Sequence, residues 1–359
     1  GACNKDDNPW QLSGGDIKWY TDWLAVRGVN LFIPHAFYYS IRGKRKDERP
    51  PDVGPHSIWW AHYEAWSTYW RRLSWLMTDI DLHAEVAVLC RNRDLCPDTV
   101  RPLFERQIGF QYIPESYFPA CTVEDGALCL HGHRYTAVLG DKALFPDAAH
   151  PEVSALEPDC RCDPPQPMLR CASFNKEGRA CWLLVNEGNT PIKTRLTLPV
   201  DAPLCRYDLW SGQPSACPAE RTAKGACLPL ELPARGSLLL FTCTGAEYAE
   251  LPAPCAACKL TCPKFEFVCC DPVSAQKTYK AQLTVTQAQL AKRHLQLTVS
   301  AEEMAELTVN GKSAGVAFWS PQTFEPDNLL QAGENELVLT VTGNMANLHG
   351  KHPVPYGLK

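Results

Sequence analysis

Long apolar runs are missing from this 359-residue sequence. No stretch approaches the roughly 18 apolar residues that a transmembrane helix requires, so we expect no membrane partner. An excess of basic residues is also missing: the net charge of −5 argues against a nucleic-acid partner. The opening residues lack the basic and apolar regions of a signal peptide. Because they also lack a Met, we expect the natural N-terminus to lie further upstream.

Cysteine, in contrast, is abundant, with 18 residues. Most of these cysteines lie in apolar, strand-like stretches such as 84–90 and 181–185, where a reduced thiol behaves as a small buried hydrophobe. We therefore expect a reducing, cytoplasmic location rather than the disulfide framework of a secreted protein. Cys255, Cys258 and Cys262 form the tightest cluster, for which zinc is the alternative to a cysteine-rich linker. No histidine follows at zinc-finger spacing, so we favour the linker and expect no metal.

Residues 1–83 show a helix–strand–helix pattern. Ser13 and Asp16 have the spacing of a capping box, and the apolar spacing that follows predicts a helix ending near Gly28. The apolar triplet 31–33 predicts a short strand ended by Pro34. A second helix is predicted from Ser57, with one apolar face made by Trp59, Tyr63, Trp66, Trp70, Leu73 and Met77. This pattern is typical of an α/β (TIM) barrel, but 83 residues supply only about a third of one.

Residues 84–165 predict a shortened flavodoxin-like α/β segment. The continuous apolar run 84–90 is typical of a buried parallel strand, a helix is expected over 99–108, and 135–139 reads as a second buried strand. Five prolines within 151–167 predict a linker.

The remainder of the chain predicts two all-β domains. Alternating apolar residues around the turn 176–178 indicate a hairpin within an antiparallel β-sandwich over 166–250. A second Pro/Cys-rich linker is expected at 251–263. Strands predicted over 280–286, 294–300, 305–309 and 336–342, with Asn310-Gly311 as a type I′ turn, indicate a jelly roll over 264–359.

Short motifs along the chain resemble those of family 106-type, α-L-rhamnosidase-like glycoside hydrolases. They lie at 23–30, 34–40, 48–52, 59–63, 183–188, 207–212, 309–311, 333–335 and 355–358. The resemblance implies that this chain is the C-terminal portion of such an enzyme, with a carbohydrate partner and a terminal galactose-binding-like jelly roll. In that family the catalytic carboxylates lie on barrel strands that precede this segment. Calcium accompanies the family's active site, but none of its ligands can be matched here.

Site candidates gather where the predicted strand 31–33 ends, because barrel active sites lie at the carboxyl ends of strands. His35 is a candidate to donate a hydrogen bond to a sugar or a leaving group, so it is the weak catalytic candidate. Tyr38 and Tyr39 are candidates to stack on a sugar ring, and Arg42 to contact its hydroxyls. We expect one of Trp59 and Trp60 to face the core and the other to line a sugar subsite.

Glycoside hydrolysis needs two carboxyl groups placed about the scissile bond. Glu48 and Asp52 are the nearby carboxylates, and we interpret both as solvated loop residues. Trp319 and His349 are candidates for sugar binding in the last domain, where a structural role is favoured. The sequence thus predicts a chain without hydrolytic activity of its own. A non-catalytic carbohydrate-binding or accessory protein and an interaction module without sugar affinity stay open as alternatives.

Overall fold

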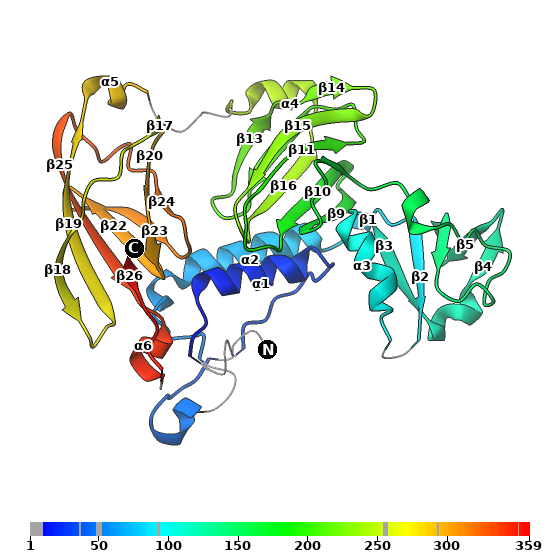
Figure 1. Cartoon of the computed structure of the whole chain (residues 1–359), viewed down its shortest axis with the longest axis horizontal. Coiled ribbons are helices and arrows are strands. Elements are labelled where there is room, and N and C mark those ends of the chain that lie inside the picture. The colour runs from blue at the N-terminus through cyan, green and yellow to red at the C-terminus, as the bar shows by residue number, and fades with distance from the viewer. Residues whose placement is uncertain are drawn as a thin grey trace. The chain divides into compact units, whose positions relative to one another are not determined.

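The computed structural model describes residues 10–35, 37–47, 52–91, 94–253, 258–292, 294–350 and 352–359. These residues form two compact units, each assembled from separate stretches of chain (Figure 1). The first unit takes its residues from within 1–21, 32–68 and 255–359, and the second from 22–31 and 69–254. None of the described helices has the length and apolar character needed to span a bilayer.

Helix α1 (Gly14–Ala25) begins at the expected capping box. The Asp16 backbone N–H donates to Ser13 Oγ at 3.1 Å, and the Ser13 backbone N–H donates to Asp16 Oδ2 at 3.2 Å. Its first turn lies against the C-terminal domain of the first unit, since a Cβ on Gly14 would stand 2.6 Å from the Phe318 carbonyl oxygen. The helix therefore starts where the sequence predicts, on a surface supplied by Phe318, 304 positions later in the sequence.

The predicted barrel strand at 31–33 is wrong. Residues 29–35 form no regular structure, and the side chains of Leu31 and Ile33 are 66% and 77% exposed. A strand is stable only when a neighbour supplies hydrogen-bond partners, and no strand of the described chain pairs with this triplet. None of the sheets closes into a barrel in the described part of the chain.

Helix α2 (Tyr63–Met77) corresponds to the second predicted helix, but it begins at Tyr63 rather than at Ser57. Trp66 is fully buried in the first unit, with its ring 5.2 Å from Phe318 and 5.9 Å from Trp319. Later turns belong to the second unit, where Leu73 is fully buried and Tyr69 donates a hydrogen bond to Asp22. The predicted face is confirmed at Trp66, Leu73 and Met77, whereas Tyr69, which the prediction left out, is buried and Trp70 is only half-buried.

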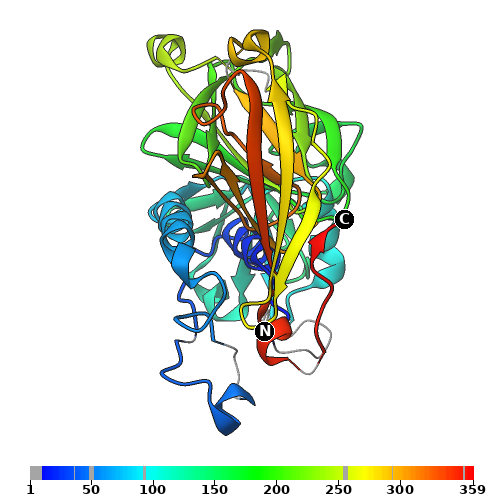
Figure 2. The same ribbon diagram turned by 90° about the vertical axis from the view of Figure 1, so that its left-hand side faces the viewer.

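The C-terminal part of the first unit is a β-sandwich of two sheets. The larger sheet has the strand order β18-β19-β25-β22-β23, and the smaller has β17-β20-β24. The bounds are β17 Cys258–Lys259, β18 Glu266–Asp271, β19 Gln276–Val285, β20 Leu295–Val299, β22 Met304–Val309, β23 Lys312–Ala317, β24 Gln322–Phe324 and β25 Gly333–Thr342. Strands β19 and β25 run antiparallel side by side over ten residue pairs (Figure 2).

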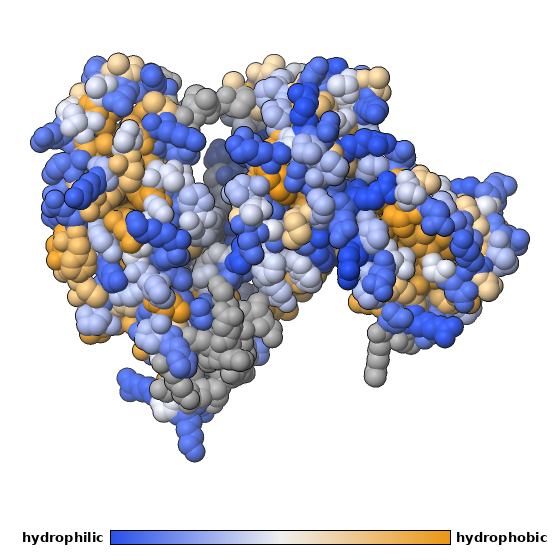
Figure 3. All heavy atoms as spheres, in the orientation of Figure 1, coloured by the Kyte–Doolittle hydropathy of each residue, from blue (hydrophilic) through white to orange (hydrophobic). Residues whose placement is uncertain are grey.

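Alternation along these strands creates the core. Leu337, Leu339 and Val341 of β25 are fully buried, while intervening residues are exposed or half-buried. Asn310 and Gly311 join β22 to β23 with φ of +51° and +77°, as a type I′ turn requires. Edge strand β18 departs from the alternation because all six of its residues are exposed. Phe267 and Val268 are among them, so this edge of the sheet presents hydrophobic surface to the solvent (Figure 3).

The second unit also contains a small parallel sheet, which includes the buried strand expected at 84–90. Its strand order is β3-β2-β7, from β3 (Phe110–Pro114), β2 (Val86–Cys90) and β7 (Ala137–Leu139). Central β2 is buried at all five positions, which explains its continuous apolar sequence. Helix α3 (Pro97–Glu105) connects β2 to β3 and buries Val100 and Leu103. An antiparallel ladder follows from β4 (Thr122–Glu124), β5 (Ala127–Leu130) and β6 (His133–Tyr135).

Two antiparallel sheets that share one hydrophobic core follow in the second unit and form a sandwich. One sheet has the order β1-β9-β10-β16-β12-β13 and the other β14-β15-β11-β8. The bounds are β1 Asp81–Leu82, β8 Arg161–Asp163, β9 Leu169–Lys176, β10 Arg179–Asn186, β11 Ile192–Leu198, β12 Leu204–Asp208, β13 Gln213–Cys217, β14 Glu220–Thr222, β15 Gly225–Leu232 and β16 Ser237–Thr242.

Two expectations about the edges of this sandwich are wrong. The predicted linker 151–167 contributes strand β8, which pairs with β11, and Cys160 beside it is buried in the sandwich core. Proline can flank a strand at a sheet edge, so its abundance there does not by itself indicate a linker. Strand β1, which precedes the predicted boundary at residue 83, pairs with β9.

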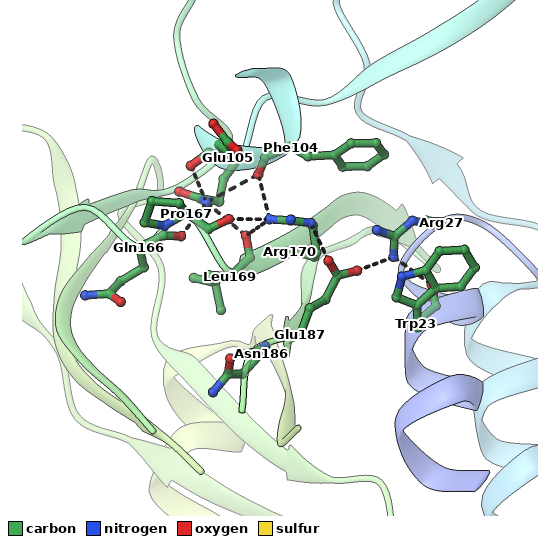
Figure 4. A network of polar contacts seen from close by, with 12 residues as sticks. Trp23, Arg27, Phe104, Glu105, Gln166, Pro167, Leu169, Arg170, Asn186 and Glu187 are labelled. Atoms are coloured by element: carbon green, nitrogen blue, oxygen red, sulfur yellow. Dashed lines mark hydrogen bonds and ion pairs between the residues drawn. The ribbon is translucent and has the colours of Figure 1, made fainter. Parts of the chain in front are cut away.

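Polar contacts join the α/β part of the second unit to its sandwich (Figure 4). Gln107 is buried and donates through Nε2 to the carbonyl oxygens of Leu169 at 2.9 Å and Gln166 at 3.1 Å. Glu187 forms ion pairs with both Arg27 and Arg170. The parallel sheet and the sandwich are consequently held as parts of one unit.

Candidate functional site

The six predicted sugar-binding residues lie in the first unit, in the chain between α1 and α2. We call residues 35–42 and 52–63, without the undescribed residue 36, the aromatic loop. His35, Tyr39 and Arg42 are exposed, Tyr38 is half-buried, and the two tryptophans differ. Trp59 is 4% exposed and Trp60 is 40% exposed, which confirms that one faces the core and one faces outward.

The Asp52 carboxylate organises the two halves of the aromatic loop. Its Oδ1 accepts hydrogen bonds from the backbone N–H groups of Tyr38 and Gly54, both at 3.0 Å. Its Oδ2 accepts from the His56 backbone N–H at 3.0 Å and lies 2.8 Å from His56 Nδ1. Asp52 is 2% exposed, so its acceptors are occupied inside the protein. It is therefore a structural anchor rather than the solvated residue the sequence suggested.

Three rings pack together on the outer side of this anchor. The Phe37 centroid lies 5.8 Å from Trp60 and 5.4 Å from Tyr63, both edge-to-face, and Trp60 lies 5.0 Å from Tyr63. Gly54 makes room for this arrangement, because a Cβ there would stand 2.8 Å from the Phe37 ring. Phe37 and Trp60 remain 51% and 40% exposed. The loop thus holds aromatic surface in a fixed position while leaving it open to a ligand.

Tyr39, two positions after Phe37 in the sequence, provides a further exposed ring. Tyr39 is 79% exposed, and the Arg45 guanidinium carbon lies 4.5 Å from the centre of its ring. The Arg42 backbone N–H donates to Ser40 Oγ at 3.2 Å, and Arg42 is exposed. The exposed rings offer faces on which the C–H groups of a sugar can stack. The nearby arginines offer hydrogen-bond donors for the sugar hydroxyls.

The aromatic loop lacks the groups of a hydrolytic centre in its described residues. The Asp52 oxygens are saturated, and Glu48 lies outside the described residues. Burial raises the pKa of the Tyr63 phenol, so this hydroxyl is neutral near pH 7. Across the part of the chain that the structure describes, no three His, Cys, Asp or Glu side chains are grouped to hold a metal ion. The arrangement is suited to binding.

The candidates in the last domain have structural contacts. Trp319 packs against Trp66, with Lys18 Nζ 5.5 Å from its ring, and His349 lies 5.5 Å from the buried ring of Trp10. Cys258 and Cys262 of the tight cysteine cluster are free thiols, and Cys255 lies outside the described residues.

Sequence reasoning missed a histidine–carboxylate pair in the second unit. His83 Nδ1 lies 3.1 Å from Asp159 Oδ1, on the wall of a large cleft. The two residues are 76 positions apart and belong to no common motif, so no local pattern indicated the contact. His56, which contacts Asp52, and Tyr63, which packs on Phe37 and Trp60, were also not among the predicted site residues.

No protein-family model matches this sequence, and no curated protein matches it. Among solved structures, a rhamnosidase from Novosphingobium sp. PP1Y is similar over 94% of this chain, with a TM-score of 0.66 and 14% identity. The chain spans 43% of that protein's length. A β-galactosidase from Bacillus circulans sp. alkalophilus matches over 48% of this chain and 44% of its own, with a TM-score of 0.25 and 12% identity. The first likeness extends through both units and is a likeness of fold.

Proposed function

We propose that this chain is the C-terminal portion of a rhamnosidase-like glycoside hydrolase, of the family 106 type, and that the aromatic loop contributes its sugar-binding surface. The carrying observation is the fold likeness to a rhamnosidase over 94% of the chain. The order of the parts supports it: two helices, a small α/β segment, a β-sandwich and a second β-sandwich follow one another along the sequence.

The chemistry of the aromatic loop is consistent with this assignment. Phe37, Tyr39 and Trp60 present exposed ring faces, and sugar rings stack on such faces through their C–H groups. Arg42 is exposed, and it is not one of the residues that pack in the aromatic cluster. In this proposal Tyr38 and Tyr39 line the site, Trp60 forms a stacking platform, Trp59 supports it from the core, and His35 reaches a sugar hydroxyl.

The chain alone is proposed to be inactive. Hydrolysis of a glycosidic bond requires an acid and a second carboxylate about 5 to 9.5 Å apart, and the aromatic loop has only the saturated Asp52 among its described carboxylates. The purified chain is therefore expected not to release nitrophenol from p-nitrophenyl α-L-rhamnoside, whereas a longer protein containing the preceding barrel strands is expected to do so. Turnover by the 359-residue chain would contradict the proposal.

Binding by the aromatic loop is tested separately from hydrolysis. Saturation-transfer NMR is expected to show binding of methyl α-L-rhamnoside, with an affinity that falls at least about tenfold in Tyr39→Ala and Trp60→Ala. Trp75→Ala and Tyr117→Ala are matched controls, because these rings are 58% and 47% exposed in the second unit. Equal loss in the controls and the loop variants would refute a site at the loop.

The second candidate is a non-catalytic carbohydrate-binding or accessory protein. The exposed rings of the aromatic loop favour it over an interaction module without sugar affinity. One experimental result distinguishes the hydrolase from the accessory carbohydrate-binding protein. If the longer protein binds the rhamnoside through the loop but leaves the glycosidic bond intact, the accessory function replaces the hydrolase.

A further inference from the structure

The second unit contains a cleft that the proposed function does not use. Its volume is about 900 Å³, within the range of small-ligand sites. The walls come from β1, from the turn before β2 and from the segment before β8, and strands of both sandwich sheets complete them. All of these elements belong to one unit, which is held together by the Gln107 hydrogen bonds and the β1–β9 pairing.

One wall of the cleft holds an oriented histidine. Asp159 is 6% exposed and lies 3.1 Å from His83 Nδ1 through Oδ1, while the His83 side chain is 55% exposed. The backbone N–H of His83 also donates to the Ser173 carbonyl oxygen at 2.9 Å. A buried carboxylate of this kind fixes both the ring plane and the protonated nitrogen, so Nε2 is left for another partner.

A carboxylate stands opposite that second nitrogen. Glu85 Oε1 lies 3.9 Å from His83 Nε2, which is beyond hydrogen-bond distance. One ligand hydroxyl placed between the two atoms could donate to Glu85 and, when the imidazole carries both protons, accept from His83 Nε2. Asn175 and Thr197 add neutral donors and acceptors to the cleft, and Trp182, Pro199 and Val200 supply apolar surface.

Charges of both signs line the cleft in similar number. Carboxylates come from Asp81, Glu85, Glu157 and Asp159, and cations from Arg134, Arg161 and Lys224. Arg161 and Glu157 already neutralise each other in an ion pair. Such a lining has no field of one sign to select an anion or a cation, but it is dense in hydrogen-bonding groups. We infer that this cleft binds a neutral oligosaccharide, at a site separate from the aromatic loop.

The test measures sugar binding to the full chain by saturation-transfer NMR with two neutral probes, maltotriose and methyl α-L-rhamnoside, and the anionic trigalacturonate. Binding of at least one neutral probe is expected, with an affinity reduced at least about tenfold in Glu85→Gln and in Asn175→Ala. Asp147→Asn removes an exposed carboxylate outside the cleft and serves as the control. Unchanged thermal unfolding of each variant establishes that the loss is local.

Three results would overturn the inference. One is the absence of saturation transfer to both neutral probes. Another is stronger binding of trigalacturonate than of either. The third is neutral-sugar binding that persists in Glu85→Gln and Asn175→Ala yet disappears in Tyr39→Ala and Trp60→Ala, which would place all binding at the aromatic loop. The reverse pattern, loss in the cleft variants alone, would support the cleft and count against the loop.

Discussion

The Nε atom of Arg170 lies 2.8 Å from Glu187 Oε2, with the two side chains only 12% and 9% exposed. Arg27 approaches the other oxygen of the same carboxylate, so Glu187 forms ion pairs with two guanidinium groups (Figure 4). Burial lowers the pKa of Arg170, and the charge of Glu187 opposes that shift. The guanidinium of Arg27 also lies 4.0 Å from the Trp23 ring centre and 5.0 Å from that of Phe104.

Glu187→Gln should lower the free energy of unfolding by about 2–4 kcal/mol, because two mostly buried cations would face each other without an anion. Urea unfolding followed by tryptophan fluorescence measures the change. Glu231→Gln is the matched control, since its pair with Lys193 is more than 70% exposed on both sides and should change stability by less than about 0.5 kcal/mol. Similar effects of the two substitutions would contradict the structural role of Glu187.

The stability of the chain should fall as the pH rises through the titration of His83. The hydrogen bond to Asp159 raises the pKa of His83, with Glu85 and Asp81 adding to it, while burial opposes the shift. A raised folded-state pKa stabilises the protein fully below about pH 6.5, and this contribution is lost as the pH rises through the folded value. Burial also raises the pKa of Asp159, which gives the same sign at lower pH.

The measurement is the urea midpoint of the wild type and of His83→Gln between pH 5.5 and 8.5. The wild-type midpoint should decrease more steeply with pH than that of the variant. Parallel curves would show that the imidazole does not gain its proton affinity from folding.

Trp66→Ala should destabilise the first unit by about 3–5 kcal/mol, since a fully buried indole is removed from contact with Phe318 and Trp319. The exposed Trp75 of the same helix is the control, and Trp75→Ala should cost no more than about 1 kcal/mol. Calorimetry of both variants makes the comparison. An equal shift of the melting temperature in the two would be incompatible with the packing described.

Asn335→Ala should cost about 2–3 kcal/mol in the C-terminal sandwich. Its buried amide accepts from Asn310 Nδ2 at 2.8 Å and from the Gln331 backbone N–H at 2.9 Å, and it donates to the Gln331 carbonyl oxygen at 2.9 Å. Removing the amide takes away these three part-buried hydrogen bonds at the fully buried Asn335 position. Chemical denaturation would report the loss, and a variant as stable as the wild type would show that water replaces the amide.

The cysteines should differ in how fast their thiols react with an alkylating reagent. Cys269 and Cys270 of β18 are exposed, whereas Cys160 is buried, Cys171 is half-buried, and the pKa values of both are raised. Brief iodoacetamide treatment of the reduced, folded chain, followed by peptide mass spectrometry, should label the β18 pair first. Labelling of Cys160 at the same rate would mean that the sandwich opens readily.

The sequence allowed prediction of those parts of the fold whose signal is local. The capping box at Ser13 and the turn at Asn310 were predicted correctly because neighbouring residues determine both. The burial of β2 and the hairpin at 176–178 followed from apolar patterning. Even the contrast between Trp59 and Trp60 was expected, since adjacent positions near a helix start face different ways.

The failures concern contacts that only the folded chain creates. The triplet at 31–33 is apolar enough for a strand, but a strand also needs an edge with which to pair. Proline content suggested a linker where β11 offers such an edge to β8. Asp52 was interpreted as solvated because no sequence pattern indicates that three backbone N–H groups converge on it. The pairing of His83 with Asp159 was likewise not predictable.

Contact between Trp66 and Phe318 has a consequence for the order of folding during synthesis. The ribosome releases residues 10–21 and 32–68 long before it makes residues 258–359, yet these stretches belong to one compact unit. At about 5–20 residues per second, the early stretch waits for tens of seconds with its tryptophans uncovered. The intervening second unit is complete first, so a nascent chain stalled before residue 258 should attract holding chaperones to its earliest segment.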